Sequence, residues 1–85
     1  MSKYEPLRAF LEHAATCVSE MTLTFWQIES ILGSPLPPSA RRYRQWWANP
    51  SSSHDHPYAQ AWLAAGWEVD VVDQREEWVR FRRSR

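Results

Sequence analysis

Hydrophobic positions along the chain recur with two different periods, one typical of helices and one typical of strands. Residues 4–16 have apolar side chains at spacings of three and four, which form one face of a helix: Leu7, Phe10, Leu11 and Ala14. In residues 20–24, apolar and polar side chains alternate, which predicts a short strand. The chain is therefore expected to combine helices with a β-sheet.

A second helix is predicted directly after this strand. Thr24 and Gln27 have the Thr-x-x-Gln form of a capping box, in which each side chain binds the backbone N–H of the other residue. The helix ends at Gly33, which readily adopts the left-handed conformation, and its apolar face consists of Phe25, Ile28, Ile31 and Leu32. Trp26 falls outside this face. We expect it to cover the edge of the core, with an exposed contact site as the alternative.

Prolines separate this helix from a third one. Residues 34–38 include three prolines and predict a rigid turn, because proline fixes φ and disfavours the helical conformation in the residue before it. A helix is predicted from Pro38 to Ala48, so that two helices and a turn form a helix-turn-helix. At 100° per residue, its positions divide into a core face with Ala40, Tyr43 and Trp47, a flank with Arg44 and Trp46, and an opposite face with Arg41, Arg42, Gln45 and Asn49.

The C-terminal part of the chain predicts a short helix and a β-hairpin. Residues 57–65 form a helix that turns small alanines and Trp62 inward and ends at Gly66. Residues 67–81 predict the hairpin, with residues 73–77 as its loop. Matching the side chains that share a face gives these opposed pairs: Val69 with Phe81, Val71 with Val79, Glu68 with Arg82, Asp70 with Arg80, and Val72 with Trp78.

This order of elements predicts an α+β fold with one domain over residues 1–85. A strand before a helix-turn-helix and a hairpin after it describe a winged-helix-like domain with a small antiparallel sheet, made of the short strand and the C-terminal hairpin. The chain of 85 residues is small for a stable core. Its six tryptophans compensate, since a buried aromatic side chain removes roughly 150–250 Å² from water.

The net charge of zero hides an uneven distribution along the chain. Residues 36–49 carry three arginines and no acid, and residues 75–85 carry five arginines and two glutamates. Residues 1–35 and 50–74 are acidic. A neutral chain is less typical of a nucleic-acid-binding protein than a basic one, so the basic block at 36–49 is the main feature that favours such a partner.

Other features argue against an exported or membrane-bound protein. Cys17 is the only cysteine, so no disulfide can form within the chain, and we expect it to be a small buried hydrophobe. The sequence has neither a leader pattern nor an apolar run of about 18 residues. We therefore expect a cytoplasmic protein without a membrane partner.

No catalytic or metal site is predicted. His54, Asp55 and His56 are of the right types for zinc, but three adjacent loop residues cannot easily converge on one ion. The serines lack the Gly-x-Ser-x-Gly elbow that exposes a nucleophile, and two glycines cannot form a Gly-rich phosphate loop. The protein is expected to be no enzyme and to need no cofactor.

The basic, aromatic segment at 41–47 leads to a first hypothesis, a small DNA-binding domain. The helix from Pro38 to Ala48 enters the major groove, where Arg pairs with guanine and Gln with adenine. The contacting residues are Arg41, Arg42 and Gln45, with Asn49 near the end of the same face and Arg44 on a phosphate. Arg75, at the hairpin tip beside Gln74, serves as a wing.

The second hypothesis is a protein-interaction module that binds and modulates a host or partner enzyme. Its contact surface consists of Trp26, Trp78 and the arginine face of the third helix. In a third interpretation of that face, the arginines pair within the protein with the acidic residues of 68–77. Helix-turn-helix proteins often bind DNA as dimers, so a homodimer is an open alternative.

Three motifs resemble those of a small domain of unknown function from bacteria and phages. They are Leu-Pro-x-Ser-Ala at 36–40, Trp-Trp-x-Asn at 46–49, and the segment from Gln60 to Trp67 that ends in Ala-Gly-Trp. The resemblance covers residues 4–82. Such domains occur alone and beside nuclease or restriction-type domains, which implies a phage or defence function on DNA. The extra serines and the trio at 54–56 depart from the family pattern, and the resemblance supplies no catalytic residues.

Overall fold

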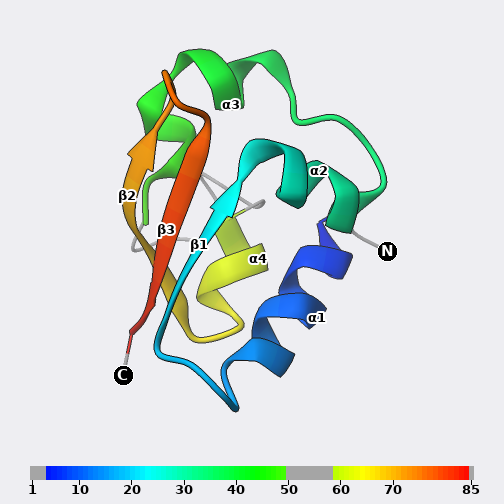
Figure 1. Cartoon of the computed structure of the whole chain (residues 1–85), viewed down its shortest axis with the longest axis vertical. Coiled ribbons are helices and arrows are strands. Elements are labelled where there is room, and N and C mark those ends of the chain that lie inside the picture. The colour runs from blue at the N-terminus through cyan, green and yellow to red at the C-terminus, as the bar shows by residue number, and fades with distance from the viewer. Residues whose placement is uncertain (1–3, 50–58, 85) are drawn as a thin grey trace.

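The computed structural model of the chain describes residues 4–49 and 59–84. Its helices and strands follow in this order: α1 (Glu5–Ala14), β1 (Glu20–Thr24), α2 (Phe25–Leu32), α3 (Pro38–Arg42), the 3-10 helix η1 (Arg44–Trp47), α4 (Gln60–Leu63), β2 (Trp67–Asp73) and β3 (Trp78–Arg83). Helices α1, α2 and α4 lie on one side of a three-stranded sheet, and α3 lies beside the β2–β3 turn (Figure 1). The α+β class predicted from the sequence is confirmed.

The sheet has the strand order β1-β3-β2 and both pairs are antiparallel. The predicted pairs Val69 with Phe81 and Glu68 with Arg82 are confirmed. A register shift between Val69 and Val71 moves the rest of β2 by one residue, because a bulge sets two residues of one strand against one of its partner. The strand pairs beyond the bulge are therefore Val71 with Arg80, Val72 with Val79, and Asp73 with Trp78, so the predicted pairs Val71 with Val79 and Val72 with Trp78 were wrong. Asp70 has no Cα partner in the register, but its side chain pairs with Arg80 as predicted, at 2.9 Å.

The signals at the start and end of α2 are confirmed in detail. The Gln27 N–H donates to Thr24 Oγ1 at 3.0 Å, and the Thr24 N–H donates to Gln27 Oε1 at 2.8 Å. At the other end Gly33 has φ +75°, a left-handed conformation that glycine adopts without strain. The helix buries Phe25 and Ile28, so these local hydrogen bonds fix the part of α2 that faces the core.

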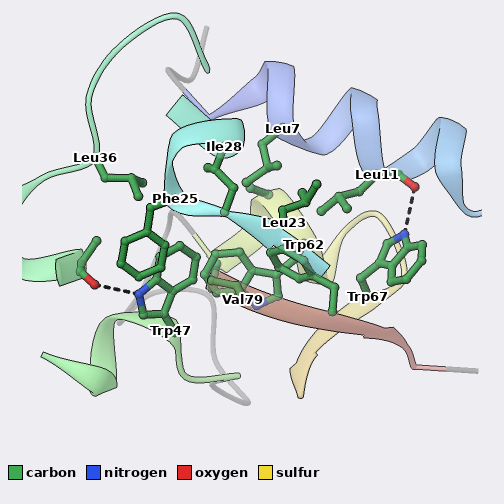
Figure 2. Close-up of a cluster of buried hydrophobic side chains, with 14 of the residues drawn as sticks. Leu7, Leu11, Leu23, Phe25, Ile28, Leu36, Trp47, Trp62, Trp67 and Val79 are labelled. Atoms are coloured by element: carbon green, nitrogen blue, oxygen red, sulfur yellow. Dashed lines mark hydrogen bonds between the residues drawn. The ribbon is translucent and has the colours of Figure 1, made fainter. Parts of the chain in front are cut away.

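Four tryptophans form the centre of the core with aliphatic side chains from α1, α2 and the sheet (Figure 2). Trp46, Trp47, Trp62 and Trp67 are each at most 6% exposed. Indole N–H groups in this cluster donate to protein acceptors: Trp47 to the Ala40 carbonyl, Trp67 to the Leu11 carbonyl and Trp62 to Asn49 Oδ1. A buried indole needs such a partner, so each of these bonds fixes where a tryptophan can sit.

The helix predicted from Pro38 to Ala48 is wrong: α3 ends at Arg42, and η1 begins at Arg44 after an extended Tyr43 with φ −115° and ψ 120°. In a continuous helix the Ala40 carbonyl would accept the N–H four residues on, that of Arg44. Here Trp47 Nε1 and Gln74 Nε2 donate to this carbonyl at 2.8 and 3.0 Å. These side-chain bonds replace the next helical bond, so the helix stops.

The break reverses the predicted positions of two aromatic side chains. Tyr43 was expected in the core and is 57% exposed, whereas Trp46 was expected at the boundary and is 6% exposed. The ring centroids of Trp46 and Trp47 lie 4.7 Å apart, and those of Trp47 and Trp62 lie 5.8 Å apart. Both tryptophans thus pack inward because the chain changes direction at Tyr43.

Two other side chains lie in different environments from those expected. Trp26 is 73% exposed and does not cover the edge of the core, because it is on the solvent side of the first turn of α2. Cys17 is exposed, three residues after the end of α1. Helix α4 spans four of the predicted residues and buries Ala61 and Trp62, while residues 57–58 lie outside the described part. No helix in the described ranges could cross a membrane.

Candidate functional site

The candidate site lies where α3, η1 and the turn between β2 and β3 meet (Figure 1). Gln74 in the turn donates to the Ala40 carbonyl of α3, and Glu77 at the end of the turn binds Arg41. These bonds join segments more than 30 residues apart in the sequence. We call residues 41–45 together with the turn residues 74–77 the arginine end.

Arg41 lies inside a network of interactions within the protein. Its guanidinium group is 2.9 Å from Glu29 Oε2 and also contacts Glu77 Oε2. It lies 5.5 Å from the centre of the Phe25 ring, in the range of a cation–π interaction. The hydrogen bond with Glu29 and the two negative charges raise the pKa of Arg41. Arg41 therefore connects α2, α3 and the turn, and its base-contacting atoms are already in use.

Glu29 is the acidic residue that organises the turn between α2 and α3. Its Oε2 atom accepts the Leu36 N–H at 2.8 Å as well as the Arg41 bond. The Leu36 bond, followed by the bond and charge of Arg41, lowers the pKa of Glu29 against the opposing effect of desolvation. The carboxylate thus stays charged and holds the proline-rich turn on α2.

Three other predicted arginines are exposed at the arginine end. They are Arg42, Arg44 and Arg75. Across residues 4–49 and 59–84, none of their guanidinium groups has a hydrogen bond or an ion pair. Three acidic residues near them already have partners: Glu29 and Glu77 bind Arg41, and Asp70 binds Arg80 and Arg82. Glu76, the residue after Arg75, is exposed and forms no ion pair in the described chain. The exposed positive charge at this end is thus uncompensated by any ion pair in the described chain.

Gln45 and Asn49 differ in their environments, although both were predicted on one helix face. Gln45 is exposed, and its side chain makes no hydrogen bond within the described chain. The Asn49 amide donates to the Val69 carbonyl and accepts the Val69 N–H, both at 2.9 Å, and its Oδ1 also accepts from Trp62 Nε1 at 3.1 Å. Asn49 is thus a structural bridge between η1, β2 and α4.

A hollow of about 350 Å³ opens beside η1, along β2. Its walls combine the ends of η1 with residues of β2: Arg44, Gln45, Trp47, Ala48, Asn49, Val69, Asp70 and Val72. Its volume falls in the range of pockets that hold small ligands. Arg44 and Gln45 belong to its lining, so the hollow shares two residues with the arginine end.

Several residues of the site carried no signal in the sequence. Tyr43 was assigned to the core. The interpretation that the arginines pair with the acidic residues of 68–77 is confirmed for Arg41 with Glu77, but its second partner Glu29, 12 residues before Arg41, was not predicted. Gln74 was expected only near a wing. The exposure of Arg42 and Gln45 could be inferred from the polar face of the predicted helix, although that helix is broken, whereas Arg44 was placed on its flank.

The described residues contain no cluster of side chains that could bind a metal ion. No three His, Cys, Asp or Glu side chains in 4–49 and 59–84 lie close enough to share a metal ion. His54, Asp55 and His56, which were considered as ligands in the sequence, lie outside the described residues. What the arginine end offers is positive charge, an exposed phenol ring and a hollow.

Comparisons with known proteins identify the family of the chain. The curated proteins and the solved structures contain no match to it. One family model, described as Domain of unknown function (DUF7662), matches residues 4–84. This match spans all of the described residues, and so both the core and the arginine end. The chain therefore belongs to the family Domain of unknown function (DUF7662).

Proposed function

We propose that this protein is a non-catalytic nucleic-acid-binding domain that contacts phosphates with its arginine end. One observation carries the proposal. Of the arginines in the described chain that lack an ion pair, three gather at this end: Arg42, Arg44 and Arg75. The fourth is Arg83, at the far end of β3.

The geometry supports phosphate contact rather than recognition by an inserted helix. Arg42 and Arg44 flank the break between α3 and η1, and Arg75 follows Gln74, whose side chain binds α3. Arginine forms paired hydrogen bonds with phosphate oxygens, and exposed arginines keep their donors available. In this proposal the β2–β3 turn acts as the wing of a winged-helix-like domain, and Arg41 holds the turn in place.

The affinity and its salt dependence test this proposal. Fluorescence anisotropy with labelled DNA, both single-stranded and duplex, is measured at several salt concentrations. Each lost phosphate contact lowers the slope of log K against log salt by about 0.7–0.9. The variant with Arg42→Ala, Arg44→Ala and Arg75→Ala is therefore expected to reduce the slope by about 2–3.

Arg83→Ala is the matched control, because it removes the same charge from an exposed position at the other end of the sheet. It is expected to leave the slope within experimental error of the original protein. Absence of binding to both forms of DNA at low salt would remove the proposed function. A triple variant that binds like the original would remove the arginine end from it.

A second candidate function is supported by Trp26. Its side chain is 73% exposed, and tryptophan is enriched among residues that dominate protein–protein binding. In this alternative the domain docks on a partner protein through the first turn of α2. Pull-down from a nuclease-treated lysate, with Trp26→Ala as the comparison, separates the two functions. A partner that is still captured after nuclease treatment but not by Trp26→Ala supports docking. A partner that is no longer captured after nuclease treatment supports nucleic-acid binding.

A further inference from the structure

We propose that the preferred nucleic acid is single-stranded, with one unstacked base on the Tyr43 ring and a neighbouring base in the hollow beside η1. This inference rests on the proposed function and names its substrate class. Three features at and beside the arginine end carry it: the short α3, the exposed Tyr43 ring and the hollow that Arg44 helps to line.

First, α3 lacks the length and the exposed face needed to read a duplex. Five helical residues rise about 7.5 Å at 1.5 Å per residue, whereas a recognition helix reads several successive bases from within the major groove. Within α3, Ala40 is buried and Arg41 is bound to Glu29 and Glu77. In the last turn of α3, Arg42 is the one polar side chain that is both exposed and without a partner in the described structure. The helix thus has one candidate contact where a duplex reader uses several.

Second, Tyr43 is an exposed aromatic ring between two exposed arginines. It is 57% exposed, and its extended backbone directs it out of the core. Proteins that bind single strands combine positive charge along the backbone path with aromatic rings on which bases stack. Arg42 and Arg44 supply the charge on either side of Tyr43. In a duplex the bases are already stacked on one another, so this ring would gain little there.

Third, the hollow offers a second place for a base. Arg44, the residue after Tyr43, belongs to its lining, and its volume is about 350 Å³. Trp47, Val69 and Val72 provide apolar wall area, while Gln45 contributes an amide without a side-chain partner in the described chain. A flat, polar-edged base fits such a mixed wall. Arg44 lines the hollow and forms no ion pair in the described chain, so in this inference it binds the phosphate between the two bases.

The test compares strand forms and one pair of Tyr43 variants. Anisotropy titrations use a single-stranded DNA of about 20 nucleotides, its RNA equivalent and the corresponding DNA duplex at one salt concentration. We expect tighter binding of single strands. Tyr43→Ala is expected to weaken single-strand binding by about 5- to 100-fold, the range for loss of one stacked base, and to leave duplex binding unchanged. Tyr43→Phe retains the ring and is expected to bind within about 3-fold of the original.

A second pair of variants tests the hollow. Ala48→Leu places a larger side chain in its wall, and Ala64→Leu makes the same change at an exposed position beyond α4. Only Ala48→Leu is expected to weaken single-strand binding. Urea unfolding of all four variants confirms that the fold is unchanged.

The outcomes separate this inference from the function on which it rests. Binding of the duplex at least as tight as that of both single strands, or an unchanged affinity in Tyr43→Ala, overturns the single-strand inference and leaves the phosphate contacts standing. Absence of binding to all three probes removes the proposed function itself. Tighter binding of either single strand than of the duplex supports the inference, and the stronger of the two shows whether ribose or deoxyribose is preferred.

Discussion

Replacing Asn49 with alanine is expected to destabilise the fold more than is usual for a substitution at an exposed residue. The Asn49 side chain makes three hydrogen bonds, two with the backbone of Val69 and one with the Trp62 indole. Alanine removes all three at once. The consequences differ for the two partners, because Trp62 is 1% exposed and Val69 is only partly buried.

The magnitude follows from what each partner loses. The Trp62 N–H would be left buried without an acceptor, which costs about 1–3 kcal/mol. Water can reach the Val69 groups, so these two bonds are each worth about 0.5–1.5 kcal/mol or less. We therefore expect a loss of about 2–4 kcal/mol in the free energy of unfolding. For a domain of this size that loss lowers the melting temperature by about 10–25 °C.

The assay is urea unfolding followed by far-UV circular dichroism, together with a double-mutant cycle. Trp62→Phe removes the indole donor but keeps an aromatic ring, so the Asn49→Ala change should cost less in that background by about 1 kcal/mol or more. Gln45→Ala, which removes an exposed side chain without a hydrogen bond in the described chain, is the control and should stay within about 0.5 kcal/mol. An Asn49→Ala loss below about 0.5 kcal/mol, or no coupling to Trp62, would refute the assigned role.

Three further changes test the interactions around α2. Because the pKa of Glu29 is lowered by the Leu36 N–H and by Arg41, its contribution to stability is complete above the ordinary glutamate value of about 4.3 and is lost as the pH falls through the lowered pKa. Unfolding midpoints across this pH range should therefore fall less steeply in Glu29→Gln than in the original, and parallel curves would contradict the assignment. Thr24→Ala removes the cap of the Gln27 N–H and should cost about 1 kcal/mol in urea unfolding, with Thr22→Ala in the same strand as the comparison; equal losses would exclude a capping role. Gly33→Ala should cost about 1 kcal/mol or more in thermal unfolding, because an alanine is strained at φ +75°. No atom lies within 4 Å of the added Cβ, so no new contact offsets this strain. A stabilised variant would show that the left-handed conformation is not retained.

The sequence was sufficient where local interactions decide the structure. The capping box at Thr24, the stop at Gly33 and the strand at 20–24 each depend on residues a few positions apart, so their signals are contained in short windows. The alternation in residues 67–81 likewise predicted the hairpin, and together these signals gave the α+β class. The core face of α1 was predicted only in part, because Leu7 and Leu11 are buried whereas Phe10 is 37% exposed.

The sequence was insufficient where distant groups compete with local ones. The third helix ends early because side chains of Trp47 and Gln74 occupy the Ala40 carbonyl, and Gln74 is 34 residues away. The bulge beside Val69 could likewise not be predicted, because strand β2 contains no glycine or proline that would indicate it. Of the candidate site, the exposure of Arg42 was predictable, and pairing of the arginines with the acids of 68–77 was one interpretation that holds for Arg41 and Glu77. The second partner of Arg41, Glu29, and the exposure of Tyr43 depend on contacts that no short window of sequence contains.

The bridge between Asn49 and Val69 also bears on how the protein behaves at high concentration. Strand β2 is at the edge of the sheet, and an edge strand can recruit a strand from another molecule through its unpaired backbone groups. The Asn49 amide occupies both groups of Val69 much as a neighbouring strand would. The Asn49 side chain thus prevents another strand from pairing with Val69. Its removal would leave the Val69 N–H and C=O groups available for pairing between molecules that are still folded.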